Sequence, residues 1–279
     1  SLINRHYIID LEDSNSFVKD LAGKGIDTYL AAWGEPLLDE LEFSLDDYIA
    51  RIEKMIDVVY KETGRKVVLT GYCMGGLLSL AAALAKSDKL QAIAFLATPW
   101  DFHVENFPRF ILNENNISTI ETLLNNYSKI PAYFVQALFY YMHAHIIGQK
   151  FEIYPFLNIG NYTKDEFLAL ENWANDGISM TRSVAKECFI CWVNNNNVSK
   201  LKWKTKGKIV NPKHIENLPA FFGIPKKDNI VPSKCAFPLS GYFKNHIIIE
   251  PNAGHVGMIV GNSAKTQTLK PFLNWLENI

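Results

Sequence analysis

Apolar and polar positions along residues 1–101 follow a pattern that predicts strands and helices in turn. Short apolar runs bounded by Gly, Pro or charged residues predict buried strands, and longer stretches with apolar residues three or four apart predict helices. The predicted strands are 26–33, 66–70 and 91–98, and the predicted helices are 14–24, 44–63 and 75–86. Because strands that alternate with helices form parallel sheets, this part of the chain predicts an α/β fold with a mostly parallel sheet.

The pattern stops after Asp101 and returns near residue 217. Residues 102–216 show no clear alternation; they are helical in pattern, aromatic and rich in Asn. The alternation is restored by two apolar runs and a closing helix, which are 218–224, 246–250 and a segment from about Ala264. We therefore expect one core formed by 1–101 and 217–279, with a large helical cap insertion at 102–216.

One short stretch combines a strand, glycines and a candidate nucleophile. Residues 70–76 are T-G-Y-C-M-G-G and follow the apolar run Val67-Val68-Leu69. A strand, then G-x-nucleophile-x-G, then a small-residue helix is the nucleophile elbow of the α/β-hydrolase fold, where the glycines make room for a strained turn. Cys73 takes the nucleophile position, and the backbone N–H of Met74 is placed to stabilise an oxyanion. The alternative is a tight strand–helix turn with a buried structural Cys.

Two downstream residues fit the acid and the base that such a nucleophile needs. In this fold the order along the chain is nucleophile, acid, base, with each partner on a loop after a later strand. Asp228 follows the apolar run 218–224, and His255 follows the run 246–250. His255 would deprotonate the thiol, and Asp228 would orient His255. The alternatives are a surface turn for Asp228 and a structural role for His255.

Composition narrows the classes of function. The 279 residues include 28 basic and 29 acidic side chains, and this balance gives no indication of nucleic acid as a partner. Four Cys do not make a disulfide framework, so we expect a cytoplasmic location, and no apolar run is long enough to indicate a transmembrane segment. Cys188 and Cys191 have no second pair beside them, which favours packed thiols, and we expect no metal. Aromatic residues make up 13% of the chain, which favours an apolar groove or interface.

Several segments resemble the signatures of the polyhydroxyalkanoate synthase family, and they run in family order from end to end. They are Leu2 to Leu11 (L-I-N-R-H-Y-I-I-D-L), Trp33-Gly34-Glu35-Pro36, Leu45-Asp46-Asp47-Tyr48, Gly71 to Gly76, Ala97 to Phe102 (A-T-P-W-D-F), Trp173 to Gly177 (W-A-N-D-G), Asp228 to Pro232 (D-N-I-V-P) and Gly254-His255-Val256-Gly257. The family polymerises 3-hydroxyacyl-CoA thioesters into polyester, and it has an α/β-hydrolase fold with a cap over the site.

The resemblance implies roles for the candidate residues and for the partners. It implies that Cys73 carries the acyl group, that His255 is the base, and that Asp228 orients it or activates the incoming hydroxyl. CoA is part of the substrate and the product, so no separate cofactor is expected. The implied partners are 3-hydroxyacyl-CoA, the growing polyester chain or granule, and a homodimer or second subunit. The implied location is cytoplasmic, on the surface of polyester granules.

The resemblance also bears on the amino terminus, where the sequence begins at Ser1. In the family a buried apolar strand lies directly before the segment that matches Leu2-Ile3-Asn4, between the predicted strands 26–33 and 66–70. The resemblance therefore implies an N-terminally truncated catalytic domain with N-terminal strands missing. It places the second oxyanion donor in the loop that contains Ile3 and Asn4.

Two other classes of protein stay open from the sequence. One is a hydrolase with a Cys nucleophile, either an intracellular polyester depolymerase or a dienelactone hydrolase type. The long separation between Cys73 and Asp228 argues against a compact hydrolase, which needs one or two βα units between these residues. The other is a non-catalytic remnant that binds acyl-CoA, polyester granules or a partner protein.

Overall fold

The structure is a computed structural model that describes residues 3–105, 107, 114–142, 152, 154 and 163–279. Its main sheet has four strands in the order β10-β9-β4-β3, and every neighbouring pair is parallel. The strands are β3 (Val67–Tyr72), β4 (Leu90–Leu96), β9 (Ala220–Gly223) and β10 (His246–Ile249). All four were predicted from the apolar runs, and the expected mostly parallel sheet of an α/β fold is confirmed.

One face of the sheet is covered by α2 (Leu45–Thr63) and α3 (Met74–Lys86), which pack on each other. The helix α2 begins where the sequence predicts, because Ser44 and Asp47 form a capping box, and it ends at Gly64 with φ 65°. Its apolar residues recur three or four positions apart and are buried: Leu45, Ile49, Ile52 and Ile56. They share a core with Ile93 and Phe95 of β4.

The other face of the sheet is covered by elements from both ends of the chain. The helices α1 (Phe17–Ala22), α10 (Gly257–Val260) and α11 (Lys270–Leu276) form a second core with Ala92, Ala94 and Leu96 of β4. The predicted closing helix is present as a π-helical turn, η9 (Lys265–Leu269), followed by α11. Side chains of β4 therefore alternate between two helical layers, as expected for a strand buried on both faces.

The remaining short elements of the core connect these layers. They are η1 (His6–Ile9), β1 (Asp10–Glu12), β2 (Asn15–Ser16), η2 (Leu38–Glu40), η3 (Ser87–Lys89), η7 (Pro212–Ile215), α9 (Ser233–Ala236) and η8 (Phe237–Tyr242). The strands β1 and β2 pair with each other in a separate antiparallel ribbon.

The prediction of a sheet strand at 26–33 is wrong. These residues have no assigned strand, and among the described residues β3 has only β4 as a neighbour in the sheet. Exposure alternates from Ile26 to Leu30 as in an extended chain, so the apolar pattern is present without the ladder of hydrogen bonds. The segment lies across an apolar cavity from β3, and this separation explains why it does not pair.

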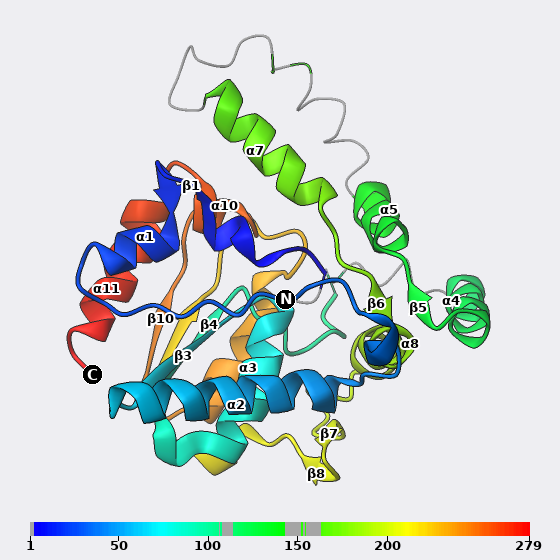
Figure 1. Cartoon of the computed structure of the whole chain (residues 1–279), viewed down its shortest axis with the longest axis horizontal. Coiled ribbons are helices and arrows are strands. Elements are labelled where there is room, and N and C mark those ends of the chain that lie inside the picture. Colours follow the sequence, from blue (N-terminus) through cyan, green and yellow to red (C-terminus); the bar gives the residue numbers. More distant parts are fainter. Residues whose placement is uncertain (1–2, 106, 108–113, 143–151, 153, 155–162) are drawn as a thin grey trace.

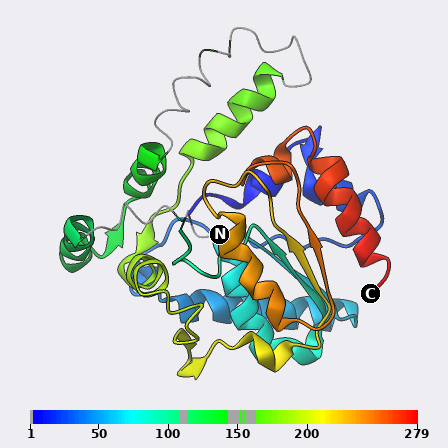
Figure 2. The same cartoon turned by 180° about the vertical axis from the view of Figure 1, so that it is seen from behind.

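The part of 102–216 that the structure describes contributes no strand to the main sheet. Their described elements are α4 (Glu114–Asn126), β5 (Lys129–Ile130), α5 (Ala132–Met142), α7 (Lys164–Asn175), β6 (Met180–Thr181), α8 (Arg182–Lys186), the π-helical η6 (Glu187–Asn194), β7 (Lys204–Thr205) and β8 (Lys208–Ile209). Both views place α4, α5 and α7 outside the sheet and its covering helices (Figures 1 and 2). The boundaries of a cap domain at 102 and 216 stay a prediction.

Candidate active site

Cys73 lies at the sharp turn between β3 and α3. Its backbone has φ 54° and ψ −130°, a conformation that residues with a side chain rarely adopt. Such strain persists only where the surrounding structure fixes it, and it is frequent at functional sites. The turn brings Cys73 to the carboxyl end of the sheet, at the start of α3, as the sequence predicts for a nucleophile elbow.

Two glycines make this turn possible because β3 and α3 approach closely. A Cβ on Gly71 would lie 2.5 Å from the Cα of Gly76. A Cβ on Gly76 would lie 2.5 Å from Cγ2 of Thr98, in the segment that follows β4. Both distances are far below van der Waals contact, so only glycine fits at these positions.

His255 and Asp228 form a buried pair at the same end of the sheet. Asp228 Oδ2 lies 2.7 Å from His255 Nδ1, and both residues are at most 9% exposed. The other oxygen, Oδ1, accepts the backbone N–H groups of Ile230 and Val231, each at 2.8 Å. With both oxygens held, the carboxylate orients the imidazole ring and leaves Nε2 for another partner.

The electrostatics couple Cys73 to His255. Burial raises the pKa of the Cys73 thiol, but the charge of His255, its hydrogen bond to Cys73 and the Met74 N–H outweigh burial, and the pKa is lowered overall. Burial lowers the pKa of His255, but the Cys73 charge and the Asp228 hydrogen bond together raise it by a larger amount. The pKa of His255 is therefore raised overall. Opposite shifts of this kind favour a thiolate–imidazolium pair, the reactive form of a Cys nucleophile.

Tyr72 belongs to this site, and sequence reasoning missed it. Its hydroxyl donates to the backbone oxygen of His255 at 3.2 Å, and the two rings lie 5.1 Å apart. Burial raises the pKa of Tyr72 well above its ordinary value, so the phenol stays protonated and keeps this bond. The position directly before the nucleophile was the only signal in the sequence.

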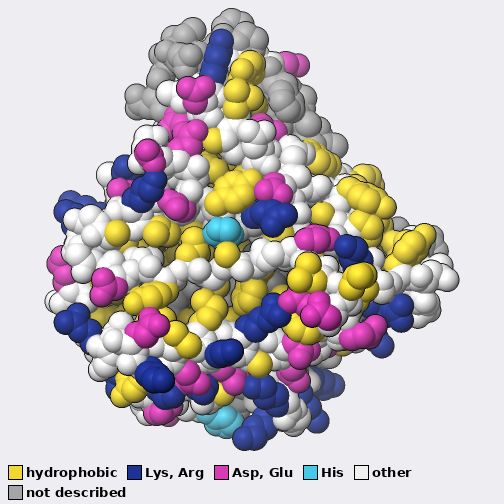
Figure 3. Space-filling model, in the orientation of Figure 1, with side chains coloured by type: hydrophobic (Ala, Val, Ile, Leu, Met, Phe, Trp, Pro, Cys, Tyr) yellow, Lys and Arg dark blue, Asp and Glu magenta, His cyan; other side chains and the backbone are white. Residues whose placement is uncertain are grey.

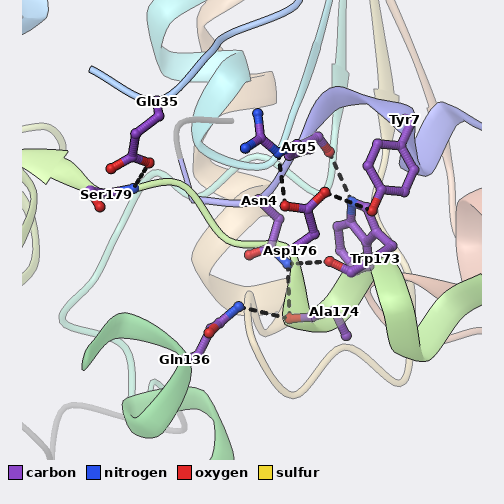
Figure 4. Close-up of polar contacts among 9 residues, drawn as sticks. All are labelled: Asn4, Arg5, Tyr7, Glu35, Gln136, Trp173, Ala174, Asp176 and Ser179. Atoms are coloured by element: carbon purple, nitrogen blue, oxygen red, sulfur yellow. Dashed lines mark hydrogen bonds and ion pairs between the residues drawn. The ribbon is translucent and has the colours of Figure 1, made fainter. Parts of the chain in front are cut away.

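The three predicted oxyanion residues differ in where they lie and in which groups they contact. Met74 is the first residue of α3, directly after Cys73, and its backbone N–H lowers the pKa of the Cys73 thiol. Ile3 and Asn4 line the cavity that also contains Cys73 and His255. The side-chain amide of Asn4 is turned to other partners, since its Nδ2 donates to the backbone oxygens of Trp173 at 3.1 Å and Ala174 at 3.3 Å (Figure 4). The oxyanion roles of Met74, Ile3 and Asn4 stay predictions.

A set of contacts, here called the Asp176 clamp, joins the loop 3–7 to the end of α7 (Figure 4). Asp176 accepts from Arg5 Nε at 2.8 Å and from the Tyr7 hydroxyl at 3.0 Å. Trp173 Nε1 donates to the Arg5 oxygen at 2.8 Å, and the N–H of Ile178 donates to the Ile3 oxygen at 2.8 Å. Apart from Ile178, these residues belong to segments that resemble family signatures, but the sequence alone does not show that they hold each other.

A cavity of about 800 Å³ opens beside the pair Cys73 and His255. Its walls are mainly apolar and come from β3, α2, the segment 26–33 and the loop 3–7. Among the residues that the structure describes, no group of three or more His, Cys, Asp or Glu could hold a metal ion. No described helix is both long and apolar enough to cross a membrane.

The comparison with protein families defines the class of this chain. The α/β-hydrolase fold family matches residues 17–261, and the chain belongs to that family. Among solved structures it is similar to a monoacylglycerol lipase from Paleococcus ferrophilus, with a TM-score of 0.54 and 15% identity over 93% of this chain and 86% of the other. It is also similar to an α/β fold family hydrolase from Bacillus anthracis, with a TM-score of 0.54 and 14% identity over 97% and 88%. At these identities the likeness concerns the fold alone.

The curated relatives carry a more particular name. Proteins called poly(3-hydroxyalkanoate) polymerase subunit PhaC match 99% of this chain, with 25% identity in Haloferax mediterranei and 26% in Allochromatium vinosum. The chain spans 57% of the Haloferax relative, 59% of the one from Haloarcula marismortui and 78% of the Allochromatium one. The resemblance to the polyhydroxyalkanoate synthase family is thereby confirmed.

Proposed function

We propose that this chain is an acyltransferase that polymerises (R)-3-hydroxyacyl-CoA into polyhydroxyalkanoate and releases CoA. The observation that carries the proposal is Cys73 on a strained elbow beside the buried pair His255 and Asp228, in a chain similar over 99% of its length to proteins named as polyester polymerases. The partners on this account are 3-hydroxyacyl-CoA and the growing polyester, with a homodimer or second subunit. The location is the cytoplasm, at granule surfaces.

In the first step the Cys73 thiolate attacks the thioester carbonyl carbon of the acyl-CoA. The negative oxygen that forms lies beside the N–H of Met74 and the loop that carries Ile3. The bond from the carbonyl carbon to the CoA sulfur breaks, and the departing sulfur takes the proton of the His255 imidazolium. The products are free CoA and an acyl thioester on Cys73.

In the second step a hydroxyl group of another 3-hydroxyacyl unit attacks the acyl group on Cys73. Neutral His255 takes the hydroxyl proton, and Asp228 stabilises the imidazolium that forms. The bond to the Cys73 sulfur breaks, so the thiolate–imidazolium pair is restored and one new ester bond has formed. Both steps use the same three side chains in the same geometry.

The thiol has a chemical advantage over a Ser hydroxyl in this reaction. A thiolate that attacks a CoA thioester forms another thioester, which keeps the acyl group activated for the hydroxyl. A Ser nucleophile would form an ordinary ester and lose that activation before the ester bond forms. Water competes with the hydroxyl, so the mainly apolar walls of the cavity favour transfer over hydrolysis.

The test is to supply 3-hydroxybutyryl-CoA to the 279-residue chain and to measure CoA release and polymer together. The proposal predicts both, and it predicts that Cys73→Ala abolishes both. CoA release with free hydroxy acid and no polymer would assign a hydrolase instead. Binding of the acyl-CoA with no CoA release would assign a non-catalytic protein.

A further inference from the structure

The loop that carries His255 is joined closely to the loop that carries Asp228. Two backbone hydrogen bonds, of 2.9 and 3.0 Å, join residues 226–227 to residues 251–253. The contact between Asp228 and the imidazole adds a third connection, of 2.7 Å. These contacts fix the base relative to its acid. The distance between the base and Cys73 needs a separate connection, because Cys73 follows a different strand, β3.

Tyr72 supplies a connection on the side of the nucleophile. It is the last residue of β3, directly before Cys73, and its hydroxyl donates to the backbone oxygen of His255 at 3.2 Å. The phenol and imidazole rings also lie 5.1 Å apart, with an angle of 36° between their planes. Tyr72 therefore contacts both the backbone and the ring of the base, and it does so from the strand that carries the thiol.

The helix α10, which begins two residues after His255, leaves the His255 oxygen to Tyr72. The N–H groups of residues 258–260 donate to the backbone oxygens of Gly254 and Val256, on either side of His255. A backbone oxygen that is held away from water needs a donor, and a carbonyl can only accept. The Tyr72 hydroxyl is therefore the donor in this contact, and the backbone at the base is held by a side chain of β3.

The surroundings of this bond are mainly apolar. Tyr72, Cys73 and His255 line the same cavity, and hydrophobic side chains gather in a recess on the face above α2 (Figure 3). A hydrogen bond is stronger where the local dielectric constant is low. Burial raises the pKa of Tyr72 well above its ordinary value, so the phenol is still a donor at the pH where Cys73 ionises. The other titratable side chains that act on His255 are Cys73 and Asp228.

We propose that Tyr72 is a positioning residue for His255, which it holds at the distance from the Cys73 sulfur that the thiolate–imidazolium pair requires. The phenol keeps its own proton in both steps of the reaction. The imidazolium gives its proton to the departing CoA sulfur, and the neutral imidazole takes a proton from the attacking hydroxyl, as before. The inference rests on the proposed function in that it assigns Tyr72 to these two proton transfers.

The first test is alkylation of Cys73 by iodoacetamide, which needs no acyl-CoA and reaches a partly exposed thiol. Tyr72→Phe keeps the ring and removes the hydroxyl, so the imidazolium is held less closely to the thiolate. The inflection in the rate against pH should therefore move upward by about half a pH unit or more. In the His255→Gln background the same substitution should leave the inflection unchanged, because there is no imidazolium to position.

The second test is turnover of 3-hydroxybutyryl-CoA. In Tyr72→Phe, kcat for CoA release should fall by about three- to tenfold while KM stays within about twofold. Tyr48→Phe is the matched control, because it removes the hydroxyl of another buried Tyr, on α2, whose ring packs on Trp33 and Phe43. The control should change neither the inflection nor kcat. Circular dichroism and thermal unfolding check that each variant keeps the fold.

The two tests separate this inference from the proposed function. An unchanged inflection in Tyr72→Phe, or an equal shift with and without the imidazole, overturns the positioning role. A shift that occurs only when His255 is present supports it, even if the unaltered chain releases no CoA. In that case the proposed function fails and the role of Tyr72 at the thiolate–imidazolium pair stands.

Discussion

At the scale of a single residue, two opposing effects determine the pKa of the Cys73 thiol. Burial favours the neutral thiol, and the neighbouring imidazolium and the Met74 N–H favour the thiolate. The second influence is the stronger, so the thiolate persists at pH values where an ordinary Cys is protonated, and it is lost as the pH falls through the lowered pKa. Asp228 acts on this balance through His255, because its hydrogen bond raises the pKa of the imidazole and so favours the imidazolium beside Cys73.

Alkylation by iodoacetamide tests the thiolate directly and needs no substrate. The rate at Cys73 against pH should have its inflection below about 8.5, the ordinary value for Cys, and His255→Gln should move the inflection upward. Cys235 is an internal control, because burial raises its pKa to about 12 and it should stay unmodified. Site-resolved mass spectrometry measures both residues in one sample. An inflection that is identical with and without the imidazole would contradict the pairing.

Asp228→Asn tests the orientation of the imidazole. The amide oxygen can still accept the N–H groups of Ile230 and Val231, so the loop should keep its shape. The amide group of Asn that faces His255 favours the wrong tautomer of the imidazole ring. The rate of CoA release should therefore fall by about 10³- to 10⁴-fold. Steady-state kinetics on 3-hydroxybutyryl-CoA measure the change, with thermal unfolding as the control for stability. A loss below tenfold would show that Asp228 does not position the base.

At the scale of secondary structure, the elbow depends on the close crossing of β3, α3 and the segment after β4. Gly76→Ala places a methyl group against Thr98 and should lower the free energy of unfolding by about 1–3 kcal/mol or more. The double variant with Thr98→Gly removes the clashing side chain and should recover part of that loss. Urea unfolding of the single and double variants measures both. If Gly76→Ala leaves the free energy of unfolding unchanged, α3 does not approach Thr98 as closely as the structure shows.

The Asp176 clamp joins α7 to the loop that carries Ile3. Burial raises the pKa of Asp176, but the hydrogen bonds from Arg5 and Tyr7 together lower it by a larger amount. The pKa of Asp176 in the folded protein is therefore below its pKa in the unfolded chain. The stabilisation is thus full above about pH 4 and is lost as the pH falls through the lowered pKa. Asp176→Asn should remove this part of the acid dependence and cost at most about 1 kcal/mol near neutral pH, since the pair is about one-third exposed.

Urea unfolding at several pH values measures the effect of Asp176→Asn. Asp13→Asn is the matched control, because Asp13 also pairs with a basic side chain, Lys19, but at the exposed surface. If the free energy of unfolding depends on pH in the same way for both variants, the Asp176 clamp stabilises the fold no more than an exposed surface pair does.

The sequence was most informative where local chemistry determines structure. The capping box at Ser44 and the left-handed Gly64 fix both ends of α2, and the elbow is recognisable because glycines and nucleophile lie within seven residues. The segment 26–33 has the pattern of a strand but no partner beside it, and a pattern of side chains does not show whether a neighbour is present. The contacts of Tyr72 and Asp176 join residues far apart in the chain, so only the folded structure shows them.

At the scale of the whole molecule, one end of the sheet brings together three separate regions of the chain. Cys73 comes from the first βα unit of the sheet, Asp228 and His255 come from the loops after β9 and β10, and the loop 3–7 is held by the end of α7. The long stretch between β4 and β9 therefore contributes to the site through the Asp176 clamp.

The central claim is that Cys73 carries the acyl group. Incubation with 3-hydroxybutyryl-CoA, rapid acid quenching and digestion, followed by mass spectrometry, detects a hydroxybutyryl group and locates it. The account predicts a thioester on the peptide that contains Cys73, which disappears in Cys73→Ala and accumulates less in His255→Gln. A hydroxybutyryl group on any other residue, or none on Cys73 while CoA is released, would contradict it.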